Sequence, residues 1–389
     1  MTRDVQTSRR IAIACGGTGG HLFPGVAVAD QLVQRNCSVT LLVSPKEVDQ
    51  AAAKMAANME VITLPAIGLQ RGQKLAFARG FLHSYLAARK CFRASPPHAV
   101  LAMGGFTSAP PLLAAKRLGA QTFLHESNTI PGRANRWLSR LVNRAFIGFP
   151  STKDLLHASQ IALTGTPVRS QFRLRAPAGS RAAMGLDPAR EVILVVGGSQ
   201  GAAGINEMVI RALPLFAKLA SELQWFHLSG PSDAEKLRQA YAAAKFRAVV
   251  EPFFGAMELA LGAATVAISR AGASALAELA AMRLPAVLVP YPAAMDNHQF
   301  HNARAFEQTG AARLLEEKCA TPEALAKLIL DLVKIEASRE KMRQALAGWH
   351  APNAAEQIAQ AILQSLETKS KTTVQRGAGQ SCAFGPVMT

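Results

Sequence analysis

Long hydrophobic runs, clustered cysteines and an apolar leader are all missing from this sequence of 389 residues. No uninterrupted apolar run reaches the roughly 18 to 20 residues that a membrane-spanning helix needs. The polar start is followed by an apolar stretch only from Ile11 to Cys15, which is shorter than the core of a signal peptide. The cysteines form no Cys-x-x-Cys pair, so the sequence argues against zinc and disulfide sites and favours a reducing compartment.

Aromatic residues make up only 6% of the chain, and acidic residues are scarce in its first half. Residues 1–169 carry a net charge of +13 and residues 170–389 a net charge of +4, which together give the formal +17. A basic half favours an anionic partner: nucleic acid, an acidic membrane surface or a phosphorylated substrate. Because no helix-turn-helix, zinc-finger or RNA-recognition signature is present, a nucleic-acid partner is disfavoured.

Apolar residues, in contrast, make up 49% of the chain, and its length favours two domains. Short β-rich runs alternate with helical stretches in both halves, which is typical of parallel sheets covered by helices on both faces. The sequence therefore predicts an α/β protein with two Rossmann-like domains. The expected divisions are an N-terminal domain at 1–169, a C-terminal domain at 170–345, a helix at 346–367 that packs back on the N-terminal domain, and a disordered tail at 368–389.

The individual elements are expected as follows. Strands are predicted at 10–15, 38–43, 60–64, 98–103, 121–125 and 145–148 in the first half, and near 191–196, 224–228, 248–250, 265–268 and 286–289 in the second. Helices are predicted at 24–35, 111–118, 203–220, 273–282 and 298–309, with further helices between 322 and 366.

A glycine-rich turn follows the first strand of each half, at Gly16–Gly20 and at Gly197–Gly201. Glycine lets the backbone approach a diphosphate or a sugar closely, and a helix N-terminus favours the negative charge. The first turn fits neither G-x-G-x-x-G nor the lysine-containing P-loop, which argues against NAD binding and ATP hydrolysis. The pair of turns predicts two phosphate-binding half-sites that face one cleft.

Three side chains of the first half are candidates for a general base. His21 directly follows the glycine turn, where a helix N-terminus should hold the imidazole neutral, although a lone histidine is often structural. His125 and Glu126 end another apolar run, and Glu126 has turn capping or a salt bridge as its alternative role. Ligands of parallel sheets bind beyond the carboxyl ends of strands, so all three are expected near one cleft.

The second half offers polar groups that suit a nucleotide sugar. Arg270 and Glu278 belong to a strand-to-helix turn, where a guanidinium would neutralise a diphosphate and a carboxylate would accept from a ribose diol. The polar loop from Asp296 to Gln299 offers donors and acceptors for a sugar. No third ligand stands at a suitable spacing from Asp296 and His298, so no metal is expected.

The segment 66–97 holds six basic residues and no acid, with apolar residues interleaved. Such a segment can lie on an anionic bilayer surface. It can equally form an ordinary amphipathic helix that packs on the sheet, and the pattern alone favours this second interpretation.

Seven motifs in order, spread over about 11–312, resemble the MurG family of glycosyltransferases, glycosyltransferase family 28. They are Gly-Gly-Thr-Gly-Gly-His at 16–21 with Pro24-Gly25, Met-Gly-Gly-Phe at 103–106 with Ser108, His125-Glu126 with Asn128, Gly165 with Pro-Val-Arg at 167–169, Gly-Gly-Ser-Gln-Gly-Ala at 197–202, Ser-Arg-Ala-Gly-Ala at 269–273 with Glu278, and Asp296 with His298-Gln299 and Asn302-Ala303. Thr166, where an Asn is usual, and Pro131 depart from the family pattern. The resemblance implies a GT-B fold, in which two Rossmann-like domains with parallel sheets face a deep cleft.

The resemblance also implies an activity, partners and a location. The implied reaction transfers N-acetylglucosamine from UDP-N-acetylglucosamine to the 4-hydroxyl of N-acetylmuramic acid in undecaprenyl-pyrophosphoryl-N-acetylmuramyl pentapeptide (lipid I), with inversion and without a cofactor, and yields lipid II for peptidoglycan. The segment 66–97 matches the family's membrane-contacting patch, so an anionic membrane surface is an expected partner. The implied location is the cytoplasmic face of the bacterial inner membrane, as a peripheral protein, with other cell-wall synthesis proteins as further partners.

Site residues are carried over by motif. The expected base is His21, with Glu126 as second choice; the substrate-binding residues are Thr18, Gly19, Gly20, Asn128, Arg169, Ser199, Phe254, Ala273, Ser274, Ala275, Leu276, Ala277, Glu278 and Gln299. Alternatives are another GT-B enzyme, such as a diacylglycerol glycosyltransferase or a UDP-sugar epimerase, a non-catalytic sugar-nucleotide or membrane-binding module, and a nucleic-acid binder.

Overall fold

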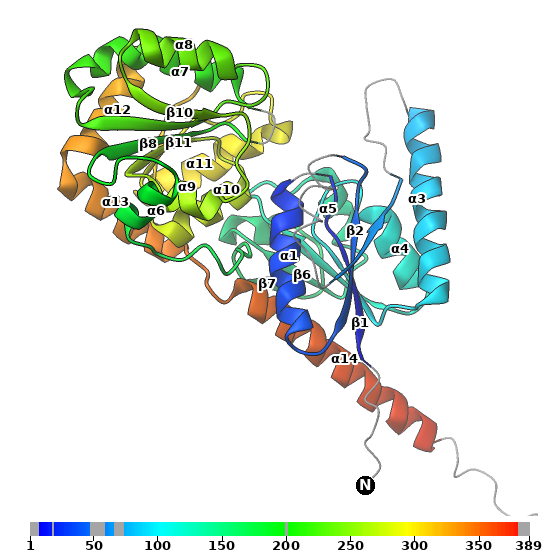
Figure 1. Ribbon diagram of the computed structural model, residues 1–389. Helices are drawn as coiled ribbons and strands as arrows, with labels where there is room; N and C mark the ends of the chain where they lie inside the picture. Colours follow the sequence, from blue (N-terminus) through cyan, green and yellow to red (C-terminus); the bar gives the residue numbers. More distant parts are fainter. Residues whose placement is uncertain (1–7, 18, 47–58, 66–73, 199–200, 380–389) are drawn as a thin grey trace, which may run out of the picture.

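The structure is a computed structural model, and the residues it describes are 8–17, 19–46, 59–65, 74–198 and 201–379. Two α/β units lie side by side, each with a central sheet flanked by helices (Figure 1). Every neighbouring strand pair found in the described residues is parallel. The two-sheet parallel architecture agrees with the predicted α/β fold.

The two sheets share one strand order, in which the first strand of each unit lies inside the sheet. The N-terminal sheet runs β3 (Glu60–Thr63), β2 (Ser38–Val43), β1 (Arg10–Ala14), β4 (Ala99–Ala102), β5 (Gln121–Glu126), β6 (Arg144–Ile147), β7 (Ile161–Leu163). The C-terminal sheet runs β10 (Arg247–Glu251), β9 (Leu223–Leu228), β8 (Glu191–Val196), β11 (Val266–Ser269), β12 (Ala286–Leu288), β13 (Arg313–Leu314). Both units are therefore doubly wound.

Helices cover both faces of each sheet. Those of the N-terminal unit are α1 (Gly19–Val33), α3 (Lys74–Ala94), α4 (Ala109–Arg117) and α5 (Arg133–Leu138). Those of the C-terminal unit are α6 (Pro177–Ala183), α7 (Ala203–Ala212), α8 (Ala234–Ala243), α9 (Met257–Ala263), α10 (Ala273–Met282), α11 (His298–Gln308), α12 (Pro322–Lys334) and α13 (Glu336–Trp349). The last helix, α14 (Ala354–Gly379), returns to the N-terminal unit and packs on α1. Short 3-10 helices are η1 (Pro150–Leu155), η2 (Leu213–Leu219) and η3 (Met295–Asn297).

The strands agree with the predicted ones to within one or two residues, apart from two short edge strands that the sequence does not reveal. Val192–Val195 of β8 are all fully buried, because a parallel strand inside the sheet is covered on both faces and reads as a continuous apolar run. The two edge strands, β7 and β13, have three and two residues. Runs this short show no periodicity from which a strand could be predicted.

The C-terminal helix differs from its predicted bounds. Residues 350–353 separate α13 from α14, which begins at Ala354 and continues to Gly379, whereas the sequence predicts one helix at 346–367 and a disordered tail from 368. Packing explains the extension. Ile358 and Ile362 are fully buried with the apolar side chains of α1, and a helix that is already nucleated extends at little cost. Residues 380–389 lie outside the described range.

Candidate active site between the two sheets

The two glycine turns lie at equivalent places in the two units. Gly16 and Gly17 follow β1, and Gly197 and Gly198 follow β8, each at the point where the chain connections go to opposite sides of the sheet. Ligands of doubly wound folds bind at such switch points. Thr18 and Ser199, two of the predicted binding residues, lie outside the described residues.

The His21 imidazole rests against a second glycine pair, at the end of β4. A Cβ at Gly104 would lie 2.9 Å from the His21 Nε2, and a Cβ at Gly105 would lie 3.2 Å from its Cε1. Both glycines have positive φ, 112° and 77°, which side-chain-bearing residues rarely adopt. The motif at 103–106 therefore makes room for the ring that follows the first turn, and His21 is half-buried in the first turn of α1.

The first glycine turn is held from two neighbouring strands. The Thr107 hydroxyl donates to the Gly16 carbonyl, and the Lys46 Nζ donates to the Gly17 carbonyl at 2.9 Å. A Cβ at Gly16 would lie 2.4 Å from the Ser44 backbone nitrogen, so only glycine fits there. Sequence analysis missed Lys46, which brings an ammonium group from the end of β2 to this turn.

His125 is fully buried, and its hydrogen bonds define its tautomer. Its Nε2 lies 3.1 Å from the Gly165 carbonyl, which can only accept, so Nε2 carries the proton and Nδ1 accepts from the Ser127 hydroxyl at 3.2 Å. Burial lowers the pKa of His125 to about 4; the Gly165 hydrogen bond opposes this decrease, and nearby His21 adds to it. With both ring nitrogens occupied, His125 joins β5 to the loop after β7.

Glu126 is buried at the end of β5 and accepts four hydrogen bonds. Its Oε1 accepts from the backbone and side-chain nitrogens of Asn128, at 2.9 and 3.0 Å. Its Oε2 accepts from the Gly132 backbone at 3.1 Å and from Asn135 Nδ2 at 2.8 Å. Burial raises the pKa of Glu126, while these hydrogen bonds lower it. The carboxyl group thus joins the end of β5 to the loop that follows and to the start of α5, which is the turn-capping alternative noted from the sequence.

Asn302 of α11 is fully buried and joins the two units through its amide. Its Oδ1 accepts from the Thr129 backbone and hydroxyl, each at 2.9 Å, and its Nδ2 donates to Asn128 Oδ1 at 3.0 Å and to the Ala271 carbonyl at 3.2 Å. The Asn128 side chain is therefore held by Glu126 and Asn302, and its expected contact with the sugar stays a prediction. The role of Asn302 was not predicted, although the residue belongs to the last sequence motif.

Glu278 and Arg169 lie close together on the C-terminal side. Burial raises the pKa of Glu278 to about 7; the Arg169 guanidinium opposes this increase, and the Glu258 carboxylate adds to it. The Arg169 Cζ lies 4.3 Å from the centre of the Phe23 ring on α1, so this buried arginine also contacts the N-terminal unit. The Glu258 Oε2 is buried and has no hydrogen-bond partner among the described residues. Sequence analysis missed this second carboxylate because no motif contains it.

Gln299 and Arg270 make different hydrogen bonds with the loops after β11 and β12. The Gln299 Oε1 accepts from the Ala271 and Tyr291 backbones, at 3.2 and 2.9 Å, and this leaves its amide nitrogen to donate elsewhere. Arg270 donates to the Val289 and Pro290 carbonyls and pairs with Glu317 at 2.5 Å. Arg270 Nη1 therefore links these loops, and the expected contact of Arg270 with a diphosphate stays a prediction.

The remaining predicted residues line the start of α10 and the loop before α9. Leu276 and Ala273 are buried in the core of the C-terminal unit, so only their backbone is available to a ligand, whereas Ser274, Ala275 and Ala277 are half-buried. Phe254 is half-buried and makes an edge contact with Phe226, with ring centres 5.1 Å apart. Gly19 and Gly20 form the first residues of α1.

The described residues contain neither a metal-binding cluster nor a membrane-spanning helix. No group of three or more His, Cys, Asp and Glu side chains in the described ranges is placed to hold a metal ion. Asp296, in the polar loop before α11, accepts from Arg136 at 2.8 Å across the boundary between the units. Among the described helices, none is both long and apolar enough to cross a membrane.

Comparison with known proteins assigns the family. The sequence matches the glycosyltransferase family 28 N-terminal domain over residues 11–147 and the C-terminal domain over 192–360. A curated relative from Anaeromyxobacter dehalogenans, a UDP-N-acetylglucosamine--N-acetylmuramyl-(pentapeptide) pyrophosphoryl-undecaprenol N-acetylglucosamine transferase, is 35% identical over 364 residues, which cover 91% of this chain and 92% of the relative. The chain belongs to glycosyltransferase family 28.

Solved structures agree with the family 28 assignment. The crystal structure of MurG from Acinetobacter baumannii is 29% identical, with a TM-score of 0.70 and coverage of 92% of this family 28 chain and 99% of MurG. The UDP-GlcNAc 2-epimerase of Neisseria meningitidis has a TM-score of 0.68 at 13% identity, with coverage of 91% and 100%, and shows the fold alone. The resemblance to family 28 and the GT-B fold predicted from the motifs are thus confirmed.

Proposed function

We propose that this family 28 protein transfers N-acetylglucosamine from UDP-N-acetylglucosamine to the 4-hydroxyl of N-acetylmuramic acid in lipid I, which yields lipid II. The observation that carries the proposal is the similarity, over nine-tenths of both chains, to a relative named as this transferase (91% and 92%). The geometry supports it, since glycine turns at both switch points suit a substrate pair with two diphosphates.

The proposed chemistry is a single inverting displacement. The acceptor oxygen forms a bond to the anomeric carbon while the bond from that carbon to UDP breaks, and the hydroxyl proton passes to a general base. We assign the base to His21, which is half-buried beside the first glycine turn. Glu126 is a poor candidate because four N–H groups already occupy its two oxygens.

The charged groups around the turns suit the two diphosphates. Arg169 and the backbone around Gly201, before α7, would stabilise the leaving UDP, as expected from the sequence. Lys46 beside Gly17 would contribute positive charge on the acceptor side. Glu278 would accept from the ribose hydroxyls, and the free amide nitrogen of Gln299 would donate to the sugar. Ser199 and Thr18 are kept as proposed contacts from the motifs alone.

The test is acceptor-dependent UDP release. The full chain is incubated with UDP-N-acetylglucosamine, with and without a soluble lipid I analogue, and free UDP is measured. We expect release only when the analogue is present. Release stimulated by diacylglycerol instead, conversion of the UDP-sugar without an acceptor, or UDP-sugar binding without turnover would each replace the proposal with one of the alternatives.

The pH dependence of donor binding provides a second prediction, which concerns Glu278. Its carboxyl must be ionised to accept from both ribose hydroxyls, and burial raises its pKa to about 7. Since the ionised form binds, the dissociation constant for UDP-N-acetylglucosamine should rise up to about tenfold per pH unit below 7. Glu258→Gln removes the neighbouring like charge and should move this midpoint to lower pH. Isothermal titration calorimetry at several pH values between roughly 5 and 8 measures the dissociation constant for the wild type and for Glu258→Gln. An unchanged midpoint in Glu258→Gln would contradict the effect of Glu258 on the pKa of Glu278.

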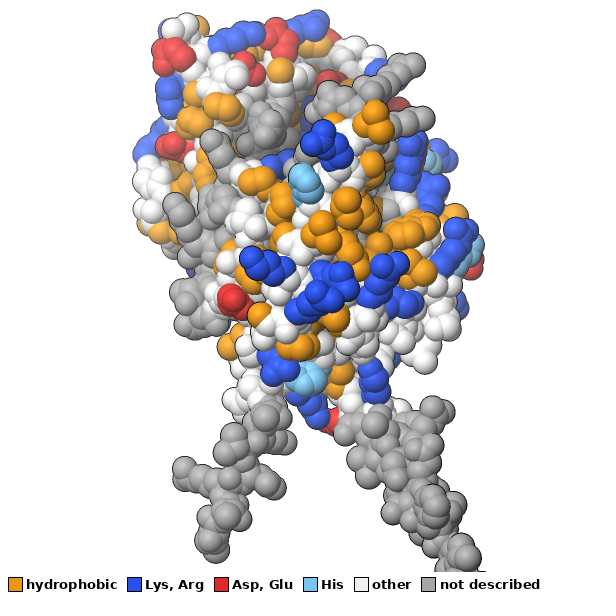
Figure 2. Space-filling model, turned by 90° about the vertical axis from the view of Figure 1, so that its right-hand side faces the viewer, with side chains coloured by type: hydrophobic (Ala, Val, Ile, Leu, Met, Phe, Trp, Pro, Cys, Tyr) orange, Lys and Arg blue, Asp and Glu red, His pale blue; other side chains and the backbone are white. Residues whose placement is uncertain are grey.

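We also propose that the outer face of α3 holds the protein on the cytoplasmic face of the inner membrane. The helix has no acidic residue, and its inner face packs on α4 and the sheet through Phe81, Tyr85 and Phe92. We therefore assign the two interpretations of this segment to opposite faces of α3: packing on the sheet to the inner face and membrane contact to the outer face. Figure 2 shows apolar side chains bordered by basic ones on this side of the molecule. The exposed leucine, arginine and lysine side chains of α3 recur at helical spacing: Leu75, Arg79, Leu82, Leu86, Lys90 and Arg93.

Vesicle binding tests the α3 surface. Replacing Arg79, Lys90 and Arg93 with Gln should weaken binding to phosphatidylglycerol vesicles about 100-fold, because each basic residue near an anionic surface is worth about 1 kcal/mol. The matched control removes Arg211, Lys218 and Lys245 from the C-terminal unit and should bind as the wild type does. Equal losses in both triple variants, measured by co-sedimentation, would indicate a net-charge effect and contradict the assignment to α3.

A further inference from the structure

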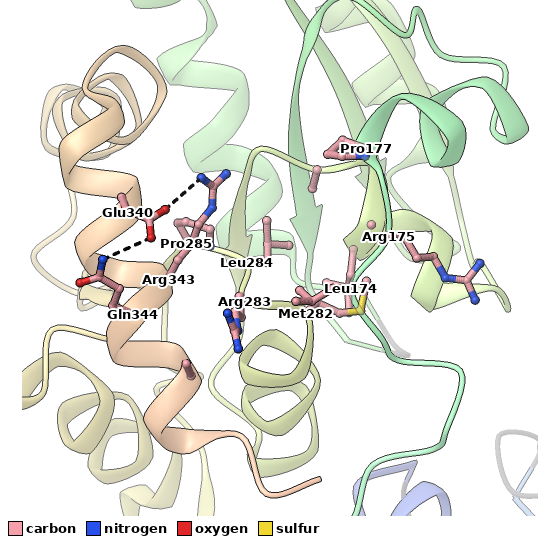
Figure 3. Close-up of a pocket in the computed structure, with 14 residues that line it drawn as sticks. Leu174, Arg175, Pro177, Met282, Arg283, Leu284, Pro285, Glu340, Arg343 and Gln344 are labelled. Atoms are coloured by element: carbon pink, nitrogen blue, oxygen red, sulfur yellow. Dashed lines mark hydrogen bonds and ion pairs between the residues drawn. The ribbon is translucent and has the colours of Figure 1, made fainter.

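A cavity of about 440 Å³ lies in the C-terminal unit between the end of α10, the last turns of α13 and the segment before α6 (Figure 3). Its floor is apolar and includes Leu261, Met282 and Leu284, which are 5%, 7% and 3% exposed. Leu174 stands at its edge and is 58% exposed, an unusual position for a large apolar side chain. The floor and edge offer an apolar body a surface to cover.

Arg283 provides this cavity with a positive charge that the protein does not neutralise. Its guanidinium has no hydrogen bond or ion pair within the described residues, whereas Arg343 on the opposite wall pairs with Glu336 and Glu340. Figure 3 shows the Arg175 side chain directed away from the cavity, so Arg283 is the cation left for a ligand. A ligand with one negative charge would match it.

Arg283 ends α10 in a left-handed conformation, with φ 48° and ψ 39°, which glycine adopts freely. Replacement of Arg283 by glycine therefore removes the charge without straining the backbone.

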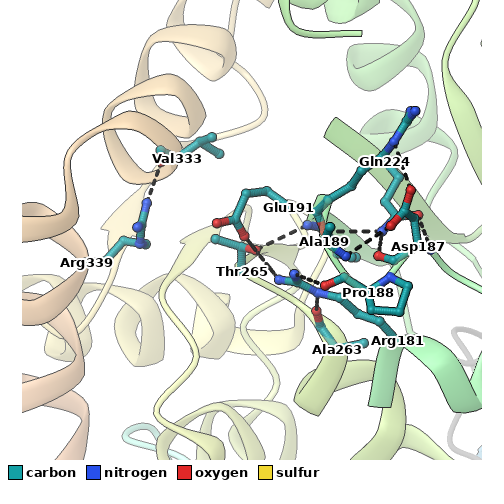
Figure 4. Close-up of polar contacts among 12 residues, drawn as sticks. Arg181, Asp187, Pro188, Ala189, Glu191, Gln224, Ala263, Thr265, Val333 and Arg339 are labelled. Carbon is teal, nitrogen blue, oxygen red and sulfur yellow. Dashed lines mark hydrogen bonds and ion pairs between the residues drawn. The ribbon is translucent and has the colours of Figure 1, made fainter. Parts of the chain in front are cut away.

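The arginines of the neighbouring cavity are, in contrast, already engaged. Arg181 donates to the Ala263 and Pro188 carbonyls, to Thr265 and to Glu191, as the dashed lines in Figure 4 show. Arg339 contacts the Val333 carbonyl and pairs with Glu336. The anion-binding position is therefore at the Arg283 end.

The cavity lies where the chain passes between the two units. Leu174 and Pro177 belong to the segment that enters the C-terminal unit, and α13 is the last element before the chain returns at 350–353. Arg283 is close enough to His350 to lower the pKa of that imidazole, in addition to the effect of burial. An occupant would contact both crossing segments. Helix α3 lies at the opposite end of the molecule from α6, α10 and α13 in Figure 1, so a ligand would come from solution rather than from the bilayer.

We propose that this cavity binds a small organic monoanion with an apolar body, whose charge pairs with Arg283. The proposal is independent of the proposed transferase function.

The probe is anilinonaphthalenesulfonate, a fluorescent aromatic monoanion, titrated into the full chain with saturating UDP to occupy the cleft. Arg283→Gly removes the charge and fits the left-handed backbone, and it should weaken binding about tenfold. Ala347→Phe fills the cavity from α13 and should abolish this binding component. Phenylnaphthylamine, an uncharged analogue, should bind Arg283→Gly as it binds the wild type, since only the charge is lost.

Two matched controls belong to this design. Lys245→Gly also replaces an exposed cation with φ 58° at a helix end, and Ala337→Phe adds the same ring to an exposed site of α13 outside the cavity. Both should bind the probe as the wild type does, and melting curves confirm folding. The proposal would be overturned if Arg283→Gly and Ala347→Phe bind the probe with wild-type affinity. It would also be overturned if Lys245→Gly loses as much affinity for the probe as Arg283→Gly does.

Discussion

Replacing His21 with alanine should reduce turnover with a lipid I analogue by about 100- to 10,000-fold, the range for loss of a general base. The affinity for UDP-N-acetylglucosamine should change little, because the proposed ribose and diphosphate contacts come from Glu278 and Arg169. Steady-state kinetics gives the first quantity and calorimetry the second. A fall in donor affinity that accounts for the whole loss would assign His21 to binding instead.

Glu126→Gln is the companion variant for this experiment. It retains the size of the side chain but replaces one acceptor oxygen with a donor that faces N–H groups of Asn128, or of Gly132 and Asn135. We therefore expect a lower melting temperature together with an altered loop. If turnover is near normal in both His21→Ala and Glu126→Gln, the assignment of the base is wrong.

Replacing Asn302 with alanine should destabilise the protein by about 2–4 kcal/mol and also impair turnover. The substitution leaves the Thr129 backbone N–H, the Asn128 side chain and the Ala271 carbonyl without their buried partner, and each such group costs about 1 kcal/mol or more. Because the first two belong to the N-terminal unit and the third to the C-terminal unit, the relative placement of the units should change as well.

Asn206→Ala is the matched control for Asn302. Asn206 is also buried and hydrogen-bonded, but to Ser229, Asp233 and His227, all within the C-terminal unit. Denaturant unfolding should show a similar loss of stability in both variants, whereas turnover at a temperature where both are folded should fall much further in Asn302→Ala. Equal turnover in the two variants would mean that Asn302 contributes only stability.

The parts of the site that sequence alone reveals are those encoded locally. The turns at Gly16 and Gly197 are predictable because a continuous apolar strand is followed at once by glycine, and a buried parallel strand leaves few other interpretations. The capping contacts of Glu126 are likewise local, since Asn128, Gly132 and Asn135 lie within 9 positions of it, in the loop after β5 and at the start of α5.

The parts that sequence does not reveal depend on packing between distant segments. Asn302 meets Thr129 across 173 positions, and no local pattern at either residue indicates the other. Arg270 pairs with Glu317, which lies 47 positions further along the chain, and no local pattern indicates that partner. Glu258 acquires its significance only because α9 packs beside α10 and brings it near Glu278.

The packing of α14 against α1 has a consequence for biosynthesis. Ile358, Ala359 and Ile362 are completely buried in the core of the N-terminal unit, although they are made after the whole C-terminal unit. The unit that leaves the ribosome first therefore lacks one wall of its core until translation is almost complete. We expect a nascent chain arrested before residue 354 to expose the apolar side of α1 to chaperones and proteases, and the last helix to act as the closing step of folding for the entire chain.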